Sequence, residues 1–253
     1  MRIEVFENNE RLDARAAQLI AEVVQASPRP VLGLATGGTP TGGYSKMREA
    51  YRSKEISFRH TVTFNLDEYV GLPASHPQSY LSYMNEHLFS HVDIPREHIH
   101  IPNGSAPDPQ QECRRYDEAL AAAGRIDLQL LGIGHNGHIG FNEPGKTLVR
   151  NTHVVDLSPT TRAANARFFR SLDEVPRQAI TMGIGSILHA KRIVLLVKGK
   201  DKADIVKRAL TGPITTEVPA SLLQTHPDLL VLLDAAAAAK LDASQVNMTL
   251  TAG

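Results

Sequence analysis

The sequence predicts an α/β fold, in which a Rossmann-like, doubly wound and mostly parallel sheet has helices on both faces. Short apolar runs alternate with longer segments of helical periodicity along the chain. Several runs are apolar at nearly every position, as in strands covered on both faces. Glycine-rich turns follow several strands and lead into helices. Neither a repeat nor a linker is evident, so we expect a single domain over residues 1–253.

Apolar periodicity and turn residues place the individual elements. Strands are expected at 2–6, 30–35, 61–66, 98–101, 126–133, 152–157, 179–182, 192–198 and 229–233. Helices are expected at 9–25, from 41, 77–88 with Ser79 near its start, 108–123, from a cap at Ser158 through Phe169, after Gly183, after Gly199, and at 234–241. The tail from Asp242 contains no recognisable motif.

Composition excludes several classes of protein. The 27 Lys and Arg balance 27 Asp and Glu, with both signs spread along the chain, which argues against a nucleic-acid partner. Cys113 is the only cysteine, so we expect an ordinary helix residue, with neither an internal disulfide nor a cysteine metal cluster. Acidic residues stand where a signal peptide is basic, and no apolar run is long enough for a membrane span. We therefore predict a cytoplasmic protein with no membrane partner.

The loop after the strand at 126–133 contains the densest group of polar residues that could do chemistry. Five glycines between 132 and 145 let the backbone bend tightly and approach a ligand. Between them stand two histidines, two asparagines and a glutamate: His135, Asn136, His138, Asn142 and Glu143. A turn that needs only flexibility would not require imidazoles and a carboxylate, so this loop is predicted to be functional.

The same loop contains a literal match to the dinucleotide-binding pattern. Residues 132–137 satisfy G-x-G-x-x-G, and Asp156 lies near the expected acidic position. That site requires a helix to open at the third glycine and hold a pyrophosphate. Here Gly140, Pro144 and Gly145 follow at once, which is poor helix sequence. We therefore expect no nicotinamide site in this loop.

A second glycine-rich turn joins the strand at 30–35 to the helix from 41. Gly37, Gly38 and Thr39 stand where free backbone N–H groups and a helix N-terminus can bind a phosphate. No Gly-Lys-Ser/Thr closes the turn, which favours a sugar phosphate over a nucleoside triphosphate. A tight turn with helix caps is the alternative.

A third candidate is Asp67, which directly follows the strand at 61–66. In open parallel sheets, ligands bind in the crevice beyond the carboxyl ends of the strands. Asp67 is therefore expected on the same edge as the two glycine loops. From the residues alone, a helix cap or a solvated carboxylate is an equally good interpretation.

Three segments, taken in order, closely resemble the glucosamine/galactosamine-6-phosphate isomerase family, and within it the glucosamine-6-phosphate deaminases. They are residues 35–40, 65–72 and 134–144. Further similarity at 161–169 and 199–203 extends the resemblance over almost the whole chain. These motifs are long and specific, unlike an isolated glycine pattern.

The resemblance implies conversion of glucosamine 6-phosphate and water into fructose 6-phosphate and ammonia, without a metal or an organic cofactor. It implies that Asp67 moves a proton from C2 to C1 of the sugar, and that His138 is the acid and base for ring opening. Asn136 and Glu143 would support ring opening. The phosphate ligands it implies are Gly37, Gly38, Thr39, Arg167 and Lys202.

The sequence departs from the family's pattern at two places. Many members have an aspartate where this chain has Asn136, so we expect Glu143 to take more of the task of orienting the histidine. Longer, hexameric members respond to N-acetylglucosamine 6-phosphate through basic residues on the strand after the central loop. Residues 152–156 contain no Arg or Lys. We therefore expect no such activation, and a monomer, with a homo-oligomer as the open alternative.

Three other interpretations remain as alternatives. A 6-phosphogluconolactonase would share the fold and a similar Gly-His loop, but would not need the motifs at 65–69 and 141–144. A non-catalytic sugar-phosphate sensor fused to a regulator would need a DNA-binding helix pair, which does not precede the first strand. A metal site from His135 and His138 is disfavoured, because their spacing lies in a glycine loop and not on a helix.

Overall fold

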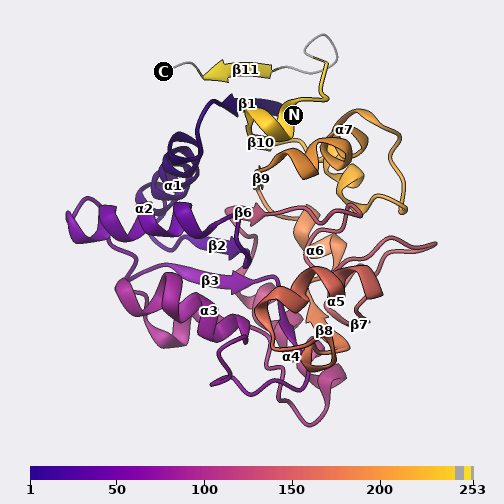
Figure 1. Ribbon diagram of the computed structural model, residues 1–253. Helices are drawn as coiled ribbons and strands as arrows, with labels where there is room; N and C mark the ends of the chain where they lie inside the picture. The colour runs from indigo at the N-terminus through magenta and orange to yellow at the C-terminus, as the bar shows by residue number, and fades with distance from the viewer. Residues whose placement is uncertain (243–247, 252–253) are drawn as a thin grey trace.

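The computed structural model describes residues 1–242 and 248–251. Within these residues, eight strands form one parallel sheet in the order β11-β1-β10-β9-β6-β2-β3-β5 (Figure 1). The strands are β1 (Arg2–Phe6), β2 (Val31–Leu34), β3 (Val62–Asn65), β5 (Ile99–His100), β6 (Leu128–Leu131), β9 (Arg192–Val197), β10 (Leu229–Asp234) and β11 (Met248–Thr251). The sheet twists from strand to strand, so the arrows of β1 and β3 point in opposite directions in Figure 1 although the strands are parallel.

The strand order reverses between β2 and β6, and this reversal positions the site. From β2 the chain moves outward to β3 and β5, and then returns to β6 on the other side of β2. Loops that leave adjacent strands in opposite directions open a crevice at the carboxyl edge of the sheet. The loops at 35–40 and 132–145 leave β2 and β6 at this point, and Asp67 follows β3 nearby.

Helices cover both faces of the sheet, which confirms the predicted doubly wound fold. On one face, α1 (Asn9–Ala26), α2 (Thr41–Arg52) and α3 (Tyr80–His87) share a core with Leu32 and Leu34 of β2. On the other face, α4 (Pro109–Ala123), α6 (Ile184–Leu188) and α7 (Ala203–Thr211) share a core with Val31 of the same strand. Successive residues of a strand point to opposite faces, so an all-apolar strand supplies both cores.

A second, smaller sheet was not predicted. β4 (Asp67–Tyr69), β8 (Gln178–Thr181) and β7 (His153–Asp156) form an antiparallel sheet with β8 in the middle. We predicted the strands that became β7 and β8, but not their partner β4, whose residues were expected only to follow the carboxyl end of β3. In this sheet Asp67 lies opposite Thr181, so the start of β4 is fixed by main-chain pairing.

Several element ends differ from the prediction. Ser79 caps α3 by accepting a hydrogen bond from the Ser82 N–H, so the helix begins three residues later than expected. Ser158 caps α5 (Pro159–Asn165) as predicted, but the helix ends early and a 3₁₀ turn, Ala166–Phe168, follows. The predicted helix at 234–241 is shorter, as α8 (Ala235–Ala238). β11 lies in the tail, for which we had predicted no strand or helix.

Other short 3₁₀ helices lie at Phe89–His91, Arg96–His98, Leu172–Glu174, Lys200–Lys202 and Pro219–Thr225. Cys113 lies on α4, as predicted, and is buried, which raises the pKa of its thiol to about 11. Among the described residues, no helix has the length and apolar character that a membrane crossing requires.

Candidate active site

A cavity of about 720 Å³ opens at the carboxyl edge of the parallel sheet. It brings together eight of the nine residues that the sequence predicted for the site: Gly37, Gly38, Thr39, Asp67, Asn136, His138, Arg167 and Lys202. The ninth, Glu143, does not line the cavity and lies behind Asn136 and His138. Segments that are far apart in the sequence therefore meet around one volume of sugar-phosphate size.

One end of the cavity is formed by the glycine turn after β2. Gly37 has a φ of +97°. Apart from the adjoining residues, no atom of the described chain lies within 4 Å of where a Cβ of Gly37 or Gly38 would be. No side chain caps the following helix α2, which argues against the alternative of a turn built for helix capping. The Tyr83 hydroxyl donates to the Gly37 carbonyl at 2.6 Å and fixes the turn. The first N–H groups of α2 are thus available to an anion.

Two cations line the cavity as well. Lys202 Nζ donates to the Ile133 carbonyl at 3.0 Å, and burial lowers the pKa of its ammonium while Asp201 opposes that change. The Arg167 guanidinium lies 4.7 Å from the centre of the Phe168 ring. In the part of the chain that the structure describes, neither cation has a carboxylate within 4 Å. Both positive charges are therefore free to meet an anionic ligand.

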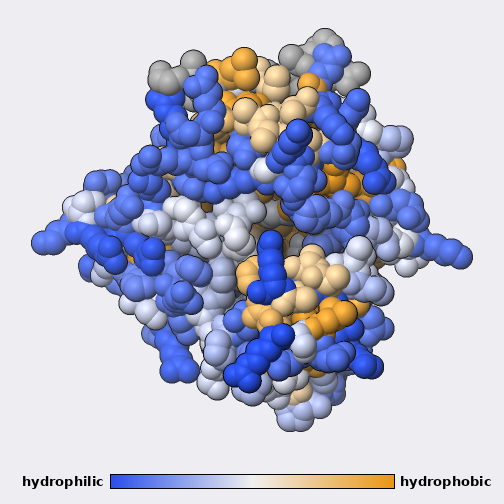
Figure 2. All heavy atoms as spheres, viewed as in Figure 1, coloured by the Kyte–Doolittle hydropathy of each residue, from blue (hydrophilic) through white to orange (hydrophobic). Residues whose placement is uncertain are grey.

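An apolar wall accompanies these cations. Figure 2 shows an orange patch over the α5 region. In the segment that follows α5 in the sequence, Phe168 and Leu172 are 43% and 47% exposed. Phe168 and Phe169 also line the cavity. The 3₁₀ turn after α5 thus supplies both the Arg167 charge and apolar surface at the mouth of the site.

Asp67 is buried at the start of β4, with 6% of its surface exposed. Burial, with a smaller contribution from the Glu68 charge, raises the pKa of its carboxyl to about 8. The aromatic rings of Tyr80 and Phe141 line the same cavity, and Tyr80 packs on Tyr69 of β4 with ring centres 4.9 Å apart. A carboxyl with a pKa near neutrality in a cavity wall has the properties of a general base.

Gly140 brings the loop that contains His138 close to Asp67. Its φ is +58°, and a Cβ at this position would lie 3.6 Å from Asp67 Oδ2 and 3.0 Å from Thr181 Oγ1. Thr181 in turn accepts a hydrogen bond from the Phe141 N–H at 3.0 Å. The loop is thereby held against β4 and β8, so that Asp67 and His138 lie on the same cavity.

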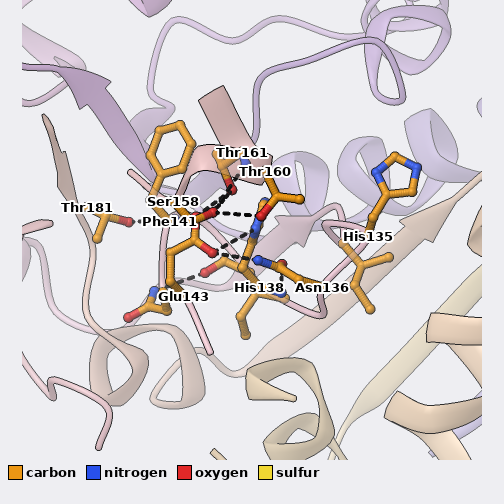
Figure 3. Close-up of polar contacts among 12 residues, drawn as sticks. His135, Asn136, His138, Phe141, Glu143, Ser158, Thr160, Thr161 and Thr181 are labelled. Atoms are coloured by element: carbon orange, nitrogen blue, oxygen red, sulfur yellow. Dashed lines mark hydrogen bonds and ion pairs between the residues drawn. The ribbon is translucent and has the colours of Figure 1, made fainter. Parts of the chain in front are cut away.

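A hydrogen-bond network orients the loop (Figure 3). Asn136 Nδ2 donates to Glu143 Oε2 at 2.6 Å, and Asn136 Oδ1 accepts from the His138 N–H at 3.1 Å. His138 Nδ1 lies 3.7 Å from Glu143 Oε2, which is ion-pair distance once the imidazole is protonated. Asn136 therefore bridges the other two residues. An aspartate here could not donate, and would place a second carboxylate against Glu143.

Glu143 also accepts hydrogen bonds from the first turn of α5. Thr161 Oγ1 donates to Glu143 Oε1 at 2.5 Å, and Ser158 Oγ donates at 3.3 Å. Burial opposes ionisation, but the His138 ring and the hydrogen bonds from Thr161 and Asn136 outweigh it and lower the pKa of Glu143 to about 2. The role of Thr161 was not predicted from the sequence, and Ser158 was expected only as a helix cap.

His135 belongs to a different part of the site. Its ring points away from His138 in Figure 3, and its Nε2 lies 2.6 Å from Asp201 Oδ2. The two histidines do not converge on a common point. Within residues 1–242 and 248–251, no three His, Cys, Asp or Glu side chains are grouped as metal ligands.

Comparisons with known proteins identify the family of the chain. Residues 7–231 match the family model described as glucosamine-6-phosphate isomerases/6-phosphogluconolactonase. A protein named glucosamine-6-phosphate deaminase from Thermoanaerobacter pseudethanolicus is 50% identical, over 94% of each chain. Another of that name, from Bacillus pumilus, is 51% identical over 92% of this chain and 97% of its own length.

Solved structures with the same fold include members of this family. The structure of a monomeric glucosamine-6-phosphate deaminase superposes with a TM-score of 0.93 at 48% identity, covering 95% of this chain and 100% of that one. The 6-phosphogluconolactonase from Trypanosoma cruzi superposes with a TM-score of 0.78 at 22% identity, covering 95% and 96%, and so shares the fold. The chain therefore belongs to the family of glucosamine-6-phosphate isomerases and 6-phosphogluconolactonases.

Proposed function

We propose that this protein is a glucosamine-6-phosphate deaminase, which converts glucosamine 6-phosphate and water into fructose 6-phosphate and ammonia. The observation that carries the proposal is the meeting of Asp67 and His138 on one cavity that also contains a cationic phosphate end. The relatives at half identity that bear this name support it.

The substrate is anchored by its phosphate. That group has a charge of about −1.5 to −2 at neutral pH, which the Arg167 and Lys202 cations and the N–H groups of the turn at Gly37–Thr39 complement. The planar fork of an arginine suits phosphate oxygens. Anchoring the far end of the hexose holds its reacting carbons against the catalytic groups and lowers the entropy cost of the reaction.

Ring opening is assigned to His138. The neutral imidazole takes the proton from the anomeric hydroxyl and returns it to the ring oxygen, which gives the open-chain aldehyde. Glu143 stays ionised because of its low pKa and stabilises the imidazolium that forms between the two transfers. Asn136 forms hydrogen bonds with both the Glu143 carboxylate and the His138 N–H, and so fixes their relative positions.

The isomerisation is assigned to Asp67. Its carboxylate removes the proton from C2 of the aldehyde, and the electrons of the broken C2–H bond form the C1–C2 double bond of an enol amine, while the aldehyde oxygen takes a proton that the substrate ammonium gives up. Asp67 then delivers its proton to C1. The electrons of the double bond form the new C1–H bond, and the nitrogen lone pair forms a protonated imine at C2. Water adds to this imine, and ammonia departs with the formation of the C2 ketone. The C1 carbonyl and the C2 amine of the substrate accept and supply the electrons that this proton transfer requires.

Ammonia release from glucosamine 6-phosphate tests the proposal against its rivals. A lactonase would instead hydrolyse 6-phosphogluconolactone, and a sensor would bind the amino sugar phosphate without turnover. Undiminished activity in the presence of a chelator is expected; a dependence on added metal would contradict the proposed route.

Isotope incorporation tests the role of Asp67. With fructose 6-phosphate and ammonium in deuterated water, the enzyme should place deuterium at C2 of the glucosamine 6-phosphate it forms. Asp67→Asn should abolish this incorporation. Deuterium at C2 in the variant's product would assign the proton transfer to another group.

A further inference from the structure

Beside the catalytic network, three side chains form a chain of contacts at the phosphate end of the cavity. Asp201 Oδ2 lies 2.6 Å from His135 Nε2, and His135 Nδ1 lies 3.3 Å from Lys202 Nζ. Lys202 Nζ also donates to the Ile133 carbonyl at 3.0 Å. His135 and Lys202 both line the cavity. The described mechanism gives neither His135 nor Asp201 a role.

The contacts fix which nitrogen of His135 has the proton. A lysine ammonium can only donate, so His135 Nδ1 must accept and the imidazole is neutral in this arrangement. Nε2 then has the hydrogen and donates it to the Asp201 carboxylate. This hydrogen bond is also the main reason why the pKa of Asp201 is lowered. Asp201 thus selects the tautomer of His135 whose Nδ1 can accept a hydrogen bond from Lys202.

The hydrogen-bond capacity of Lys202 is then nearly used up. An ammonium has three N–H groups. The Ile133 carbonyl takes one and His135 takes the second, both from the loop that leaves β6. One N–H group is left for a ligand in the cavity that Lys202 lines. A lysine held at two points loses less freedom on binding an anion than a free one, because its long side chain is already ordered.

We propose that His135, oriented by Asp201, is a positioning residue that holds Lys202 Nζ in place for the phosphate of the substrate. The inference rests on the proposed function, since it assigns Lys202 to the phosphate. It adds a residue of the central loop whose task is affinity, whereas Asn136 and His138 of the same loop serve ring opening. Loss of His135 should therefore raise KM much more than it lowers kcat.

The test compares His135→Ala, His135→Gln, Lys202→Ala and the double variant His135→Ala/Lys202→Ala. KM and kcat are measured with glucosamine 6-phosphate, and the Kd of inorganic phosphate is measured by calorimetry. His135→Ala should raise both KM and Kd about tenfold, the effect of one hydrogen bond to a charged group, with kcat within about twofold. His135→Gln keeps one acceptor and one donor, and should restore most of the affinity. His189→Ala, an exposed histidine outside the cavity, is the matched control.

The double variant gives the decisive result. If His135 acts through Lys202, its removal should add almost nothing once Lys202 is absent. Additive effects on KM and Kd, or an unchanged KM in His135→Ala, would overturn the inference. The calorimetry needs no turnover, so it decides the inference even if the unaltered protein releases no ammonia, a result that would instead refute the proposed function.

Discussion

Asp67 occupies an environment that suits catalysis and opposes stability. Its carboxyl is buried beside Glu68 and aromatic rings, which raises its pKa to about 8. A base works best when its pKa lies near the working pH. The same burial disfavours the charged carboxylate in the folded state, whereas the unfolded chain ionises freely.

The raised pKa predicts an acid limb in the rate profile. Asp67 must be ionised to take the C2 proton, so kcat/KM for glucosamine 6-phosphate should rise with pH up to about 8 and then level off. Rates should be compared above about pH 7, where the substrate phosphate, with a pKa near 6, no longer titrates. A kcat/KM that stays constant from about pH 7 to pH 9 would contradict the assignment.

The same shift predicts that Asp67→Asn is more stable than the unaltered protein. Below pH 3.8, the ordinary carboxyl pKa, both folded and unfolded forms are protonated and the variant gains nothing. Between there and about pH 8 only the unfolded chain is ionised, so the unaltered protein loses stability by at most about 1.4 kcal/mol per pH unit.

Urea unfolding at several pH values measures this difference. The gain in free energy of unfolding for Asp67→Asn should grow with pH and become constant above about pH 8. Asp173→Asn, at an exposed position, is the matched control and should show no such trend. A gain of equal size at all pH values would point to packing and not to ionisation.

Glu143 and Asn136 can be separated by substitution. Glu143→Gln removes the charge 3.7 Å from the His138 ring, and should lower turnover of the cyclic substrate about 10²-fold. Asn136→Ala removes a bridging amide but leaves the charge, so its loss of turnover should be less than about tenfold. Steady-state kinetics at neutral pH measures both, and equal losses would count against the assignment of this task to Glu143.

At the scale of elements, α3 connects the two ends of the site. The Glu68 carboxylate accepts hydrogen bonds from the Tyr80 and Leu81 N–H groups, which ties the first turn of the helix to β4 and hence to Asp67. Tyr83, in the same helix, holds the Gly37 carbonyl. The distance between the base and the phosphate turn is therefore set by one short helix.

This connection predicts a specific effect of Tyr83→Phe. Losing the hydroxyl releases the Gly37 carbonyl, so the turn becomes less ordered and KM for glucosamine 6-phosphate should rise about three- to tenfold. The melting temperature should change little, since the ring still packs against the His87 ring. Tyr51→Phe, on α2, serves as the control because Tyr51 does not line the cavity. An unchanged KM would mean that the turn keeps its shape without this tether.

At the scale of the molecule, the site depends on the integrity of the whole sheet. Asp67, the loop after β6 and Lys202 come from widely separated segments, and both cores pack on the same strands. We expect residues 1–253 to behave as a single domain and the protein to be a monomer. The related structure at 48% identity is itself described as monomeric.

Both inferences are measurable. Calorimetry should give one unfolding transition whose calorimetric and van't Hoff enthalpies agree. Sedimentation should give a mass near 27.6 kDa over the concentration range of the assay. Two separated transitions would divide the chain into independent units, and a mass that rises with concentration would mean self-association.

The local pattern of the sequence was sufficient for much of the fold. Neighbouring residues encode the strands that are apolar at every position and the helices that begin at a cap such as Ser158. This is because periodicity and capping involve contacts a few positions apart. The glycine turns at 37–38 and 132–145 were visible for the same reason. The resemblance to a known family supplied the residue roles, which no local pattern contains.

Only the tertiary structure decided how these pieces meet. The small sheet that fixes Asp67, the Thr161 hydrogen bond to Glu143, and the contact of His135 with Asp201 all join residues that are distant in the sequence. The burial that raises the Asp67 pKa also comes from such neighbours. The sequence by itself thus determined the elements and their candidate residues, whereas folding decided their distances, burial and charge environment, because these depend on long-range packing that periodicity does not record.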